Sequence, residues 1–515
     1  MWDHIIVGAG TAGCTLAHAL TESGANKVLL IEAGGKPGLL SEIPAGMPKL
    51  FRSKYDWAFE SEPQSALGGR RIFTPRGKML GGSSNMNAQI HQWGHPADFD
   101  GWAETGLAGW SWADVQPYFR RLEGWTGEDA TQSRGRLGPL RVESACRSGP
   151  LAEAFVAAAR AAGLDGPPDY NGTAYSGAWL CQVAHRGGRR FSGWHAMLRP
   201  AMKRPNLKVE THAFAERILF EGRTAIGIVA DGREYRGRKI VLAAGAFGSP
   251  QLLMLSGIGP AEQLQAHGIA PLHESPGVGA NLQDHALAGL GFAAPGQSTL
   301  KSAGGIGALV RWLLLKRGPL ASNIAEAFAF TSVKDRAAPD CELLFAPVQW
   351  RNQGLEEPEL DAVTIAPIVL QPRSKGCVRL RSADPRDGPA IDFRLLTDPE
   401  GQDAAILLAG ANLARTIART EPLASRLGPE LPQTAQARSD ADILTALKET
   451  AQTVYHPTSS CRMGADERAP LDERLRVRGV ERLWVADASA MPAVPRGHPN
   501  APTAMIAARA AQWLQ

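Results

Sequence analysis

The chain has 515 residues, which is too long for one ordinary domain of about 100–200 residues and favours several. Hydrophobic residues make up 44% and charged residues 21%, a composition typical of folded globular proteins that excludes an intrinsically disordered chain. The net charge of +4 gives no electrostatic reason to expect nucleic acid or an anionic membrane surface as a partner.

The first 32 residues have a strand–helix–strand pattern. Residues 3–7 form an apolar run, residues 12–20 have helical spacing, and residues 27–31 form a second apolar run. This βαβ unit predicts a parallel sheet. Residues 33–110 are rich in Gly, Pro and Trp and weakly periodic, so we expect long functional loops there.

Later segments return to regular patterns in three parts of the chain. We expect helices over residues 150–163, 250–255, 260–268, 403–419 and 501–514, and strands over residues 207–211, 226–229, 239–244, 377–381 and 482–486. The β segments at the start, the middle and the end resemble one another. One domain is therefore expected to be assembled from separated pieces, with another domain inserted between them.

Cysteine usage and the chain start bear on the compartment. The six cysteines form no C-x-x-C pair, which favours free thiols and argues against a zinc ribbon. The start has no basic region before an apolar one, and the most apolar stretch, residues 306–315, is short and broken by Arg311. We expect no membrane span and a cytoplasmic location, with export directed by an upstream segment as the alternative.

The most specific local motif is GAGTAG at residues 8–13, between the first strand and the first helix. Its glycines allow a tight turn, close backbone approach to a pyrophosphate, and close packing of helix on strand. Glu32 ends the second strand, where a carboxylate accepts hydrogen bonds from ribose hydroxyls. The motif predicts a dinucleotide but does not separate NAD from FAD; the EAGG ending at residues 32–35 favours FAD. A glycine-rich turn in another α/β fold is the alternative.

Further motifs resemble one known family. They are PRGKMLGGSSNMN at 75–87, GAFGSPQLLMLSGIGP at 245–260, PGVGANLQDH at 276–285, YHP at 455–457, VADASAMP at 485–492 and GHPNAPT at 497–503. In this order they resemble the glucose–methanol–choline (GMC) flavoprotein oxidoreductases. The resemblance implies an α/β protein, α+β overall, with a Rossmann-like FAD-binding domain on a parallel sheet and a substrate-binding domain on an antiparallel sheet with helices.

The resemblance also implies domain bounds and cofactor contacts. We expect an FAD-binding domain over residues 1–290 and 470–515, with a loop or cap region near 40–200, and a substrate-binding domain over 291–469. The implied FAD contacts are Gly8, Gly10, Thr11, Ala12, Gly13, Glu32, Ala33, Gly82, Ser83, Asn87, Ala215, Ala244, Gly245, Asp487, Ala488, Asn500, Pro502 and Thr503. Some relatives carry a flavin-linking histidine near residues 85–87. This chain has Asn-Met-Asn there, which predicts non-covalent FAD.

Two of the twelve histidines lie in the motif-rich C-terminal loops. Alcohol oxidation by a flavin needs a base for the hydroxyl proton and a partner that orients the oxygen, and histidine suits both. By resemblance, His456 is the base and His498 the partner, with Asn500 as the alternative partner. The family's usual Gly-Thr after the motif histidine is replaced by TSSC at 458–461, which we expect to be tolerated because Ser460 keeps a hydroxyl.

The substrate face is expected from residues 290–470. Candidate lining residues are Trp93, Glu326, Phe328, Trp350, Val454 and Tyr455. We expect oxidation of a primary alcohol, with an aromatic one favoured, to an aldehyde, with oxygen or another electron acceptor, no nucleic acid and no metal. The alternatives are a choline-type or other polyol or alcohol dehydrogenase that uses a non-oxygen acceptor, with Glu326 as the residue to hold choline's quaternary ammonium, a hydroxynitrile-type lyase with structural FAD, and a flavin-bearing protein without turnover.

Overall fold

The computed structural model describes residues 1–129, 132–144, 149–171, 176–334 and 336–515. Its first sheet runs in the order β11-β2-β1-β14, with β25 also on β14, and these pairs are parallel. The antiparallel strands β13 and β12 extend it from the first half of β14. The bounds are β1 (Trp2–Val7), β2 (Val28–Glu32), β11 (Leu207–Thr211), β12 (Ala215–Glu221), β13 (Thr224–Ala230), β14 (Arg233–Leu242) and β25 (Leu483–Val485).

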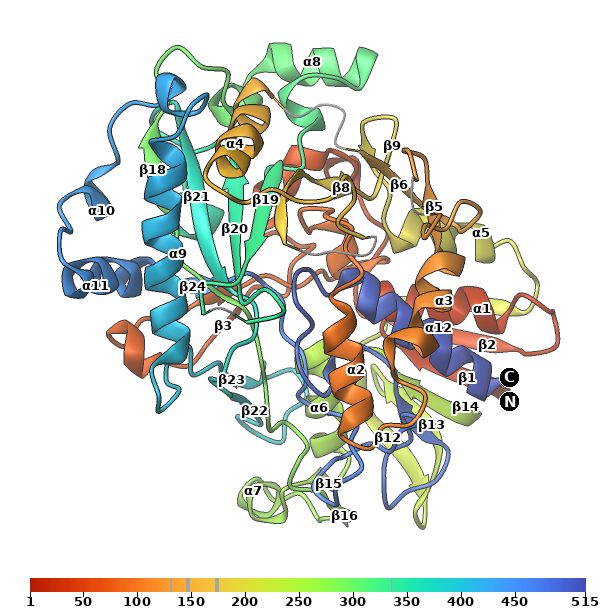
Figure 1. Cartoon of the computed structure of the whole chain (residues 1–515). Helices are drawn as coiled ribbons and strands as arrows, with labels where there is room; N and C mark the ends of the chain where they lie inside the picture. Colours follow the sequence, from red (N-terminus) through yellow and green to blue (C-terminus); the bar gives the residue numbers. More distant parts are fainter. Residues whose placement is uncertain (130–131, 145–148, 172–175, 335) are drawn as a thin grey trace.

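Helices cover the parallel part of this sheet, because strand β2 is apolar from Val28 to Ile31. All five residues of β2 are buried, which matches a parallel strand with both faces covered. Helix α1 (Thr11–Leu20) packs on α12 (Asn500–Leu514), and α12 packs on α3 (Trp112–Leu122), so the chain's end closes over its start (Figure 1). The predicted βαβ unit and the predicted final strand and helix are confirmed.

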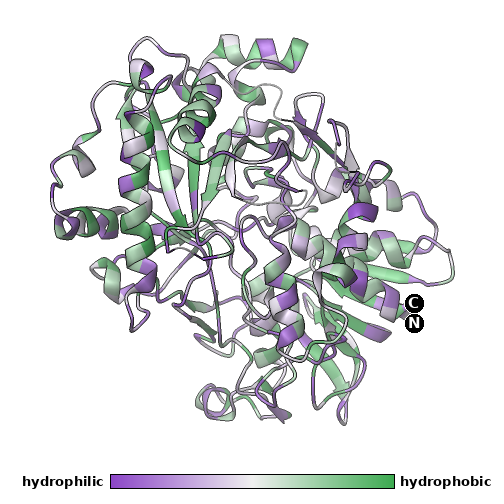
Figure 2. Cartoon of the chain, in the orientation of Figure 1, coloured by the Kyte–Doolittle hydropathy of each residue, from purple (hydrophilic) through white to green (hydrophobic). Residues whose placement is uncertain are grey.

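The second sheet is antiparallel and runs in the order β24-β17-β21-β20-β19-β7, with β18 also on β21. Its apolar strands are green in Figure 2. The bounds are β7 (Gly177–Leu180), β17 (Ala286–Leu287), β18 (Leu290–Ala293), β19 (Ala327–Thr331), β20 (Cys341–Ala346), β21 (Ala362–Val369) and β24 (Gln452–Thr453).

The two faces of this sheet have different neighbours. Helices α4 (Pro150–Ala161) and α9 (Gln402–Ala418) pack on one face, where Leu343, Phe345 and Val363 join their core. The alternate residues Leu344, Ala346, Thr364 and Ala366 line a cavity on the other face. This alternation follows from the two-residue period of a strand, and it places one wall of the candidate site.

The two sheets confirm the predicted fold class. The domain bounds stay a prediction. Strands β7 and β17 lie before residue 291 yet belong to the antiparallel sheet, and α4 packs on that sheet. We therefore propose that the substrate-binding unit also takes in residues near 150–180 and 286–290.

Shorter elements connect these two layers. Residues 33–110, predicted as loops, hold short 3-10 turns, short strands and one α-helix. The predicted helices at 250–255 and 260–268 are the second half of α6 (Gly245–Leu255) and α7 (Ala261–Ala266), and the strand predicted at 377–381 is β22 (Cys377–Arg379). The remaining elements are β3 (Phe59–Glu60), β4 (Phe73–Thr74), η4 (Gly82–Asn85), α2 (Pro96–Glu104), β5 (Glu123–Trp125), β6 (Leu140–Ser144), β8 (Gln182–Val183), β9 (His185–Arg186), β10 (Arg189–Arg190), α5 (Arg199–Ala201), β15 (Ile258–Gly259), β16 (His273–Glu274), α8 (Ile306–Leu315), β23 (Ala390–Asp392), α10 (Pro432–Ala435) and α11 (Asp440–Thr450).

The described cysteines are free thiols: Cys14, Cys181, Cys341, Cys377 and Cys461. Cys146 lies outside the described residues. Among the residues that the structure describes, no helix combines the length and the apolar character needed to cross a bilayer.

Candidate active site

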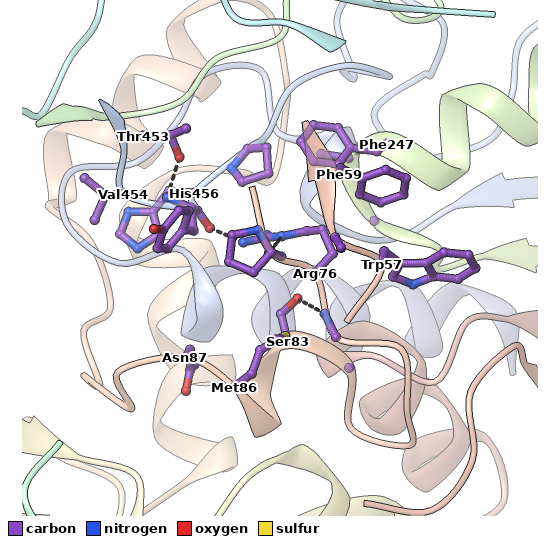
Figure 3. Close-up of a pocket in the computed structure, with 18 of the residues that line it drawn as sticks. Trp57, Phe59, Arg76, Ser83, Met86, Asn87, Phe247, Thr453, Val454 and His456 are labelled. Carbon is purple, nitrogen blue, oxygen red and sulfur yellow. Dashed lines mark hydrogen bonds between the residues drawn. The ribbon is translucent and has the colours of Figure 1, made fainter. Parts of the chain in front are cut away.

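A cavity of about 1310 Å³ lies between the two sheets. Small-molecule sites usually measure about 300–1,000 Å³, so this one is large enough for an extended ligand and a second, smaller molecule. Its walls come from the carboxyl ends of the parallel strands, the loop 75–88 and the inner face of the antiparallel sheet. Figure 3 shows Val454 and His456 at one end of the pocket, and Trp57 and Phe247 at the other.

The glycines of the first motif build one end of this cavity from backbone. Gly8 has a φ of +99°, and a Cβ there would lie 2.5 Å from the Ala243 carbonyl oxygen. A Cβ on Gly13 would lie 1.8 Å from the Gly8 carbonyl oxygen, so α1 packs directly on the turn. A Cβ on Gly10 would have no atom of the described residues within 4 Å. The cavity therefore meets bare backbone at the start of α1, where unpaired N–H groups attract phosphates.

Glu32 lies on the cavity wall where β2 ends. One carboxylate oxygen accepts a hydrogen bond from the Ala9 N–H and the other from the Gly34 N–H, both at 2.8 Å. Burial raises the pKa of Glu32, and these two hydrogen bonds oppose that shift. Each oxygen of a carboxylate has a second lone pair, so Glu32 can still accept from ribose hydroxyls.

The second glycine-rich loop contacts the first. A Cβ on Gly82, in η4, would lie 2.7 Å from the Gly10 Cα, and the Gly77 N–H donates to the Ser83 hydroxyl at 3.1 Å. Asn87 also lies on the cavity wall, where Arg190 donates to its side-chain oxygen at 2.8 Å and to its carbonyl oxygen at 2.7 Å. The loop is thus held against α1 without filling the cavity.

Asp487 joins the ends of two neighbouring parallel strands. One oxygen accepts from the Gly245 N–H at 2.8 Å and the Ser249 hydroxyl at 2.6 Å, and the other accepts from the Ser489 N–H at 2.8 Å and hydroxyl at 2.5 Å. These contacts fix the start of α6 to the end of β25. A Cβ on Gly245 would have nothing within 4 Å among the described residues, so backbone again faces open cavity.

Most of the predicted cofactor residues meet at this cavity. Those on its wall are Gly8, Gly10, Thr11, Ala12, Glu32, Ala33, Gly82, Ser83, Asn87, Ala215, Ala244, Gly245, Asp487, Ala488, Asn500 and Thr503. Gly13 and Pro502 lie outside it: Gly13 at the contact of α1 with the Gly8 turn, and Pro502 buried in the first turn of α12. Gly13 thus has the packing role that the motif predicts for one of its glycines, and the FAD contacts of both residues stay predictions.

The two predicted catalytic histidines lie side by side at the other end. The ring centroids of His456 and His498 are 4.9 Å apart, with an interplanar angle of 85°. The Nδ1 atoms of His456 and His285 are 3.0 Å apart, and the Nε2 of His498 is 3.1 Å from a carboxylate oxygen of Glu342. Burial, followed by the charges of His498, His285 and Arg76, lowers the pKa of His456 well below its ordinary 6.5.

Asn500, the alternative partner of His456, has a different neighbour. Its side-chain oxygen accepts a hydrogen bond from the Thr11 hydroxyl at 2.7 Å, which joins the start of α12 to the start of α1. It therefore lies beside the glycine-rich turn, whereas His498 lies beside His456. This geometry favours His498 over Asn500 as the partner.

The six predicted substrate residues divide into two groups. Trp350, Val454 and Tyr455 line the cavity. Trp93, Glu326 and Phe328 are buried and are not among the residues of its wall, and their role at the substrate stays a prediction. Trp93 stacks on Phe119 with centroids 5.6 Å apart.

The other two buried residues are held by their own partners. Glu326 accepts from the Ser322 hydroxyl at 2.6 Å and from the Gly149 N–H at 2.9 Å. Phe328 packs against Tyr170, with centroids 4.8 Å apart, in a separate apolar cluster. The sequence around residues 326–328 did not show Gly149 and Tyr170 as neighbours because both come from segments before residue 180.

Four residues without a predicted role surround the histidine pair. His285 contacts the His456 ring and Glu342 contacts the His498 ring. An Asp284 side-chain oxygen accepts a hydrogen bond from the backbone N–H of His456 at 2.9 Å. Burial raises the pKa of Asp284 to about 7. Arg76 donates to the Tyr455 carbonyl oxygen at 2.6 Å. Glu342 could have been noticed in the sequence as a carboxylate within the otherwise apolar strand CELLFA. Asp284 and His285 are the last two residues of the motif at 276–285.

Comparison with known proteins identifies the family. Two family models described as GMC oxidoreductase match residues 2–287 and 372–507. The chain is 38% identical to an oxygen-dependent choline dehydrogenase of Brucella suis, covering 99% of this chain and 95% of that one. It is 37% identical to an alcohol dehydrogenase [acceptor] of Pseudomonas putida, covering 100% and 96%.

A solved structure gives the same result. The fold superposes on pyridoxine 4-oxidase from Mesorbium loti with a TM-score of 0.91 at 30% identity, covering 100% of this chain and 99% of that one. FAD is the cofactor typical of the matched family, and its members act on CH–OH donors. The chain belongs to the GMC oxidoreductase family and is an oxidoreductase of alcohols.

Proposed function

We propose that this protein oxidises a primary alcohol to an aldehyde with non-covalently bound FAD, and that His456 removes the hydroxyl proton. The observation that carries the proposal is the pairing of His456 and His498, with ring centroids 4.9 Å apart, at one end of a cavity whose other end meets the bare backbone of the glycine-rich turns. That arrangement provides both groups that the oxidation requires, beside a space suited to a dinucleotide.

The residues present fit FAD. Gly10 and Gly245 leave open space where side chains would otherwise intrude, and Glu32 keeps lone pairs for ribose. The N-terminus of α12, with Asn500 and Thr503 on the cavity wall, offers a positive dipole end that would stabilise negative charge on a bound flavin. Bound FAD supplies the acceptor for the hydride that leaves the carbinol carbon. Residues 85–87 contain no histidine, which supports non-covalent attachment.

His456 is neutral at physiological pH because its pKa is lowered, so it can accept a proton. His285 is also neutral, since burial lowers its pKa to about 3. In the tautomer that makes His456 a base, its Nδ1–H donates to the Nδ1 of His285, which leaves the His456 Nε2 lone pair for the hydroxyl proton. His285 thereby fixes both the tautomer and the ring orientation of His456.

We assign His498 the role of orienting the alcohol oxygen. Its Nε2–H donates to the buried carboxylate of Glu342, so the ring is held in place against the His456 ring. A hydrogen-bond donor beside the oxygen stabilises the negative charge that develops as the proton leaves, and the His498 ring serves as that donor when it carries a proton on Nδ1 as well as on Nε2. Glu342 is then a positioning residue that acts through His498.

The cavity wall supports an apolar or aromatic alcohol. Trp350, Val454 and Tyr455 line it, and Leu344 and Ala346 add aliphatic surface. The choline-type alternative relied on Glu326, whose carboxylate already binds Ser322 and Gly149 behind the wall. We therefore propose a primary alcohol, with an aromatic one favoured, as the substrate.

The test is anaerobic mixing of the FAD-loaded enzyme with aliphatic, benzylic and quaternary-ammonium alcohols. We expect at least one primary alcohol to bleach the flavin absorbance, with the matching aldehyde as product. Peroxide formation in air would then separate an oxidase from a dehydrogenase. If no alcohol bleaches the flavin, the proposal fails, and cleavage of a cyanohydrin without bleaching would establish the lyase alternative.

A further inference from the structure

Helix α8 (Ile306–Leu315) presents apolar side chains to solvent. It lies at the top edge of the molecule in Figure 1, and Figure 2 shows green on its outer face. Ile306 is 83% exposed and Leu314 76%. Leu309, Val310 and Leu313 are exposed as well. Scattered exposed leucines need no explanation, but a contiguous group on one helix does.

These five residues form one stripe. They occupy positions i, i+3, i+4, i+7 and i+8, which is the spacing of a helix face that normally packs on a core. Here the helix is attached by a different face. Trp312 is fully buried, and its indole N–H donates to the Gly188 carbonyl oxygen at 2.9 Å. Because this anchor leaves the stripe outside, the apolar face has no partner within the described chain.

The segment around the stripe is basic. Residues 301–325 contain Lys301, Arg311, Lys316 and Arg317 and no Asp or Glu. Arg189 of the neighbouring hairpin lies over the Trp312 ring at 5.7 Å, but it pairs with Glu42 at 2.8 Å, so the local excess of positive charge comes from residues 301–325 themselves. The whole chain is nearly neutral, so its net charge gave no sign of this local excess. An apolar stripe flanked by positive charge complements a surface that is apolar inside and anionic at its edge.

Two kinds of occupant compete for this face. Stable protein–protein interfaces bury about 1,200–2,000 Å² and are depleted in lysine. A single helix of ten residues, about 15 Å long, offers far less than that area. The same helix is also too short to span a bilayer, which takes about 20 apolar residues. An interfacial helix needs only a stripe and flanking positive charge.

We propose that α8 is a membrane-docking helix, which lies in the plane of an anionic lipid surface with Ile306, Leu309, Val310, Leu313 and Leu314 in the acyl boundary. Lys301 and Arg317 then meet lipid phosphates, and Trp312 fixes the helix to the protein. The attachment is peripheral and reversible, because one short stripe buries only a few side chains. The proposal is independent of the alcohol that the enzyme oxidises.

The experiment is cosedimentation of the FAD-loaded enzyme with vesicles of phosphatidylcholine, with and without phosphatidylglycerol. We expect binding to the anionic vesicles, with less binding at high salt because screening weakens surface charge pairs. The double variant Leu313→Asp, Leu314→Asp is expected to lose at least about tenfold in bound fraction, since a carboxylate cannot enter the acyl boundary that the two leucines occupy. The variant Lys301→Glu, Arg317→Glu should lose binding to anionic vesicles specifically.

Leu137→Asp is the matched control, because Leu137 is 98% exposed but belongs to no apolar stripe. It should bind vesicles as the wild type does. All variants should keep the FAD content and melting temperature of the wild type, since the substituted side chains lie on the surface. Failure of the wild type to bind anionic vesicles, or equal binding by the Leu313/Leu314 variant, overturns the proposal. So does a wild-type dimer that this variant splits without any vesicle binding, which would assign α8 to a protein interface.

Discussion

The two ends of the cavity are built differently. The cofactor end is made of backbone, where Gly8, Gly10, Gly82 and Gly245 let two loops and two helix starts approach an open space. The reaction end is made of side chains, with His456 and His498 each held by a buried partner from another strand or loop. A backbone site tolerates no added atoms, whereas a side-chain site depends on which groups are charged and how they are oriented. Substitutions at the cofactor end should therefore lower FAD affinity, whereas substitutions at the reaction end should lower the rate of flavin reduction.

Gly77→Ala should have the broadest effect, because it weakens binding of the cofactor on which the whole reaction depends. A Cβ there would lie 2.2 Å from the Gly82 carbonyl carbon, and neither backbone segment can move without opening the loop 75–87. Overpacking of this kind costs about 1–3 kcal/mol, which lowers FAD affinity by about 5- to 150-fold. Flavin absorbance per protein measures it. Gly101→Ala in α2, where a Cβ meets nothing within 4 Å of the described residues, is the control. Full flavin content in Gly77→Ala would contradict the backbone account.

His498→Ala should spare FAD and slow the reaction. Loss of one donor to a developing oxyanion costs about 10²–10³ in rate, and we expect the rate of anaerobic flavin reduction to fall by that factor. Asn500→Ala is the contrast, because Asn500 binds Thr11 at the cofactor end and should change FAD affinity more than the rate. If the two variants exchange these effects, Asn500 is the catalytic partner and the division between the two ends is wrong.

Glu342→Gln should have a smaller effect at the same end. Glutamine keeps the size of the side chain and a hydrogen bond to His498, but it loses the charge. Hydrogen bonds to charged groups exceed neutral ones by about 1 kcal/mol, so the reduction rate should fall about five- to tenfold with FAD content unchanged. A shifted pH profile of reduction distinguishes a positioning role from general destabilisation. An unshifted profile with an unchanged rate would remove Glu342 from the account.

The pH dependence should be the smallest effect near neutrality. A base must be unprotonated, and the lowered pKa of His456 moves its protonation to the acid side of 6.5. The reduction rate should therefore stay constant as pH falls from about 9 to about 7 and decline only below that. Stopped-flow reduction across this range measures it. A rate that already declines between pH 8 and 7 would show that another group, such as Asp284, controls the reaction.

The sequence predicted the cofactor end well because that end uses contiguous motifs. Tight turns and close approaches need glycine at fixed positions, and a fixed acid follows at Glu32, so the physical requirement is visible in the residue types themselves. Gly13 is required for a different reason. A side chain at this position would collide with the Gly8 turn, so the packing of α1 on that turn demands glycine.

The reaction end was predicted only in part. His456 and His498 lie in recognisable motifs, whereas Glu342 reaches His498 from a strand more than 150 residues away. Phe328 lies on β19, which is apolar on both faces, so its sequence does not show which side meets the cavity. Glu326 directly precedes that strand, and Trp93 is an aromatic side chain, which serves a core as well as a pocket. These outcomes depend on which distant segments cover each face.

The most direct test of the central assignment is single-turnover flavin reduction by the best alcohol in the wild type and in His456→Ala, at equal FAD occupancy and without oxygen. A general base contributes about 10²–10⁴ in rate. We predict a loss of that size in His456→Ala with normal flavin absorbance, since His456 lies at the reaction end. Reduction of His456→Ala at the wild-type rate would contradict the account.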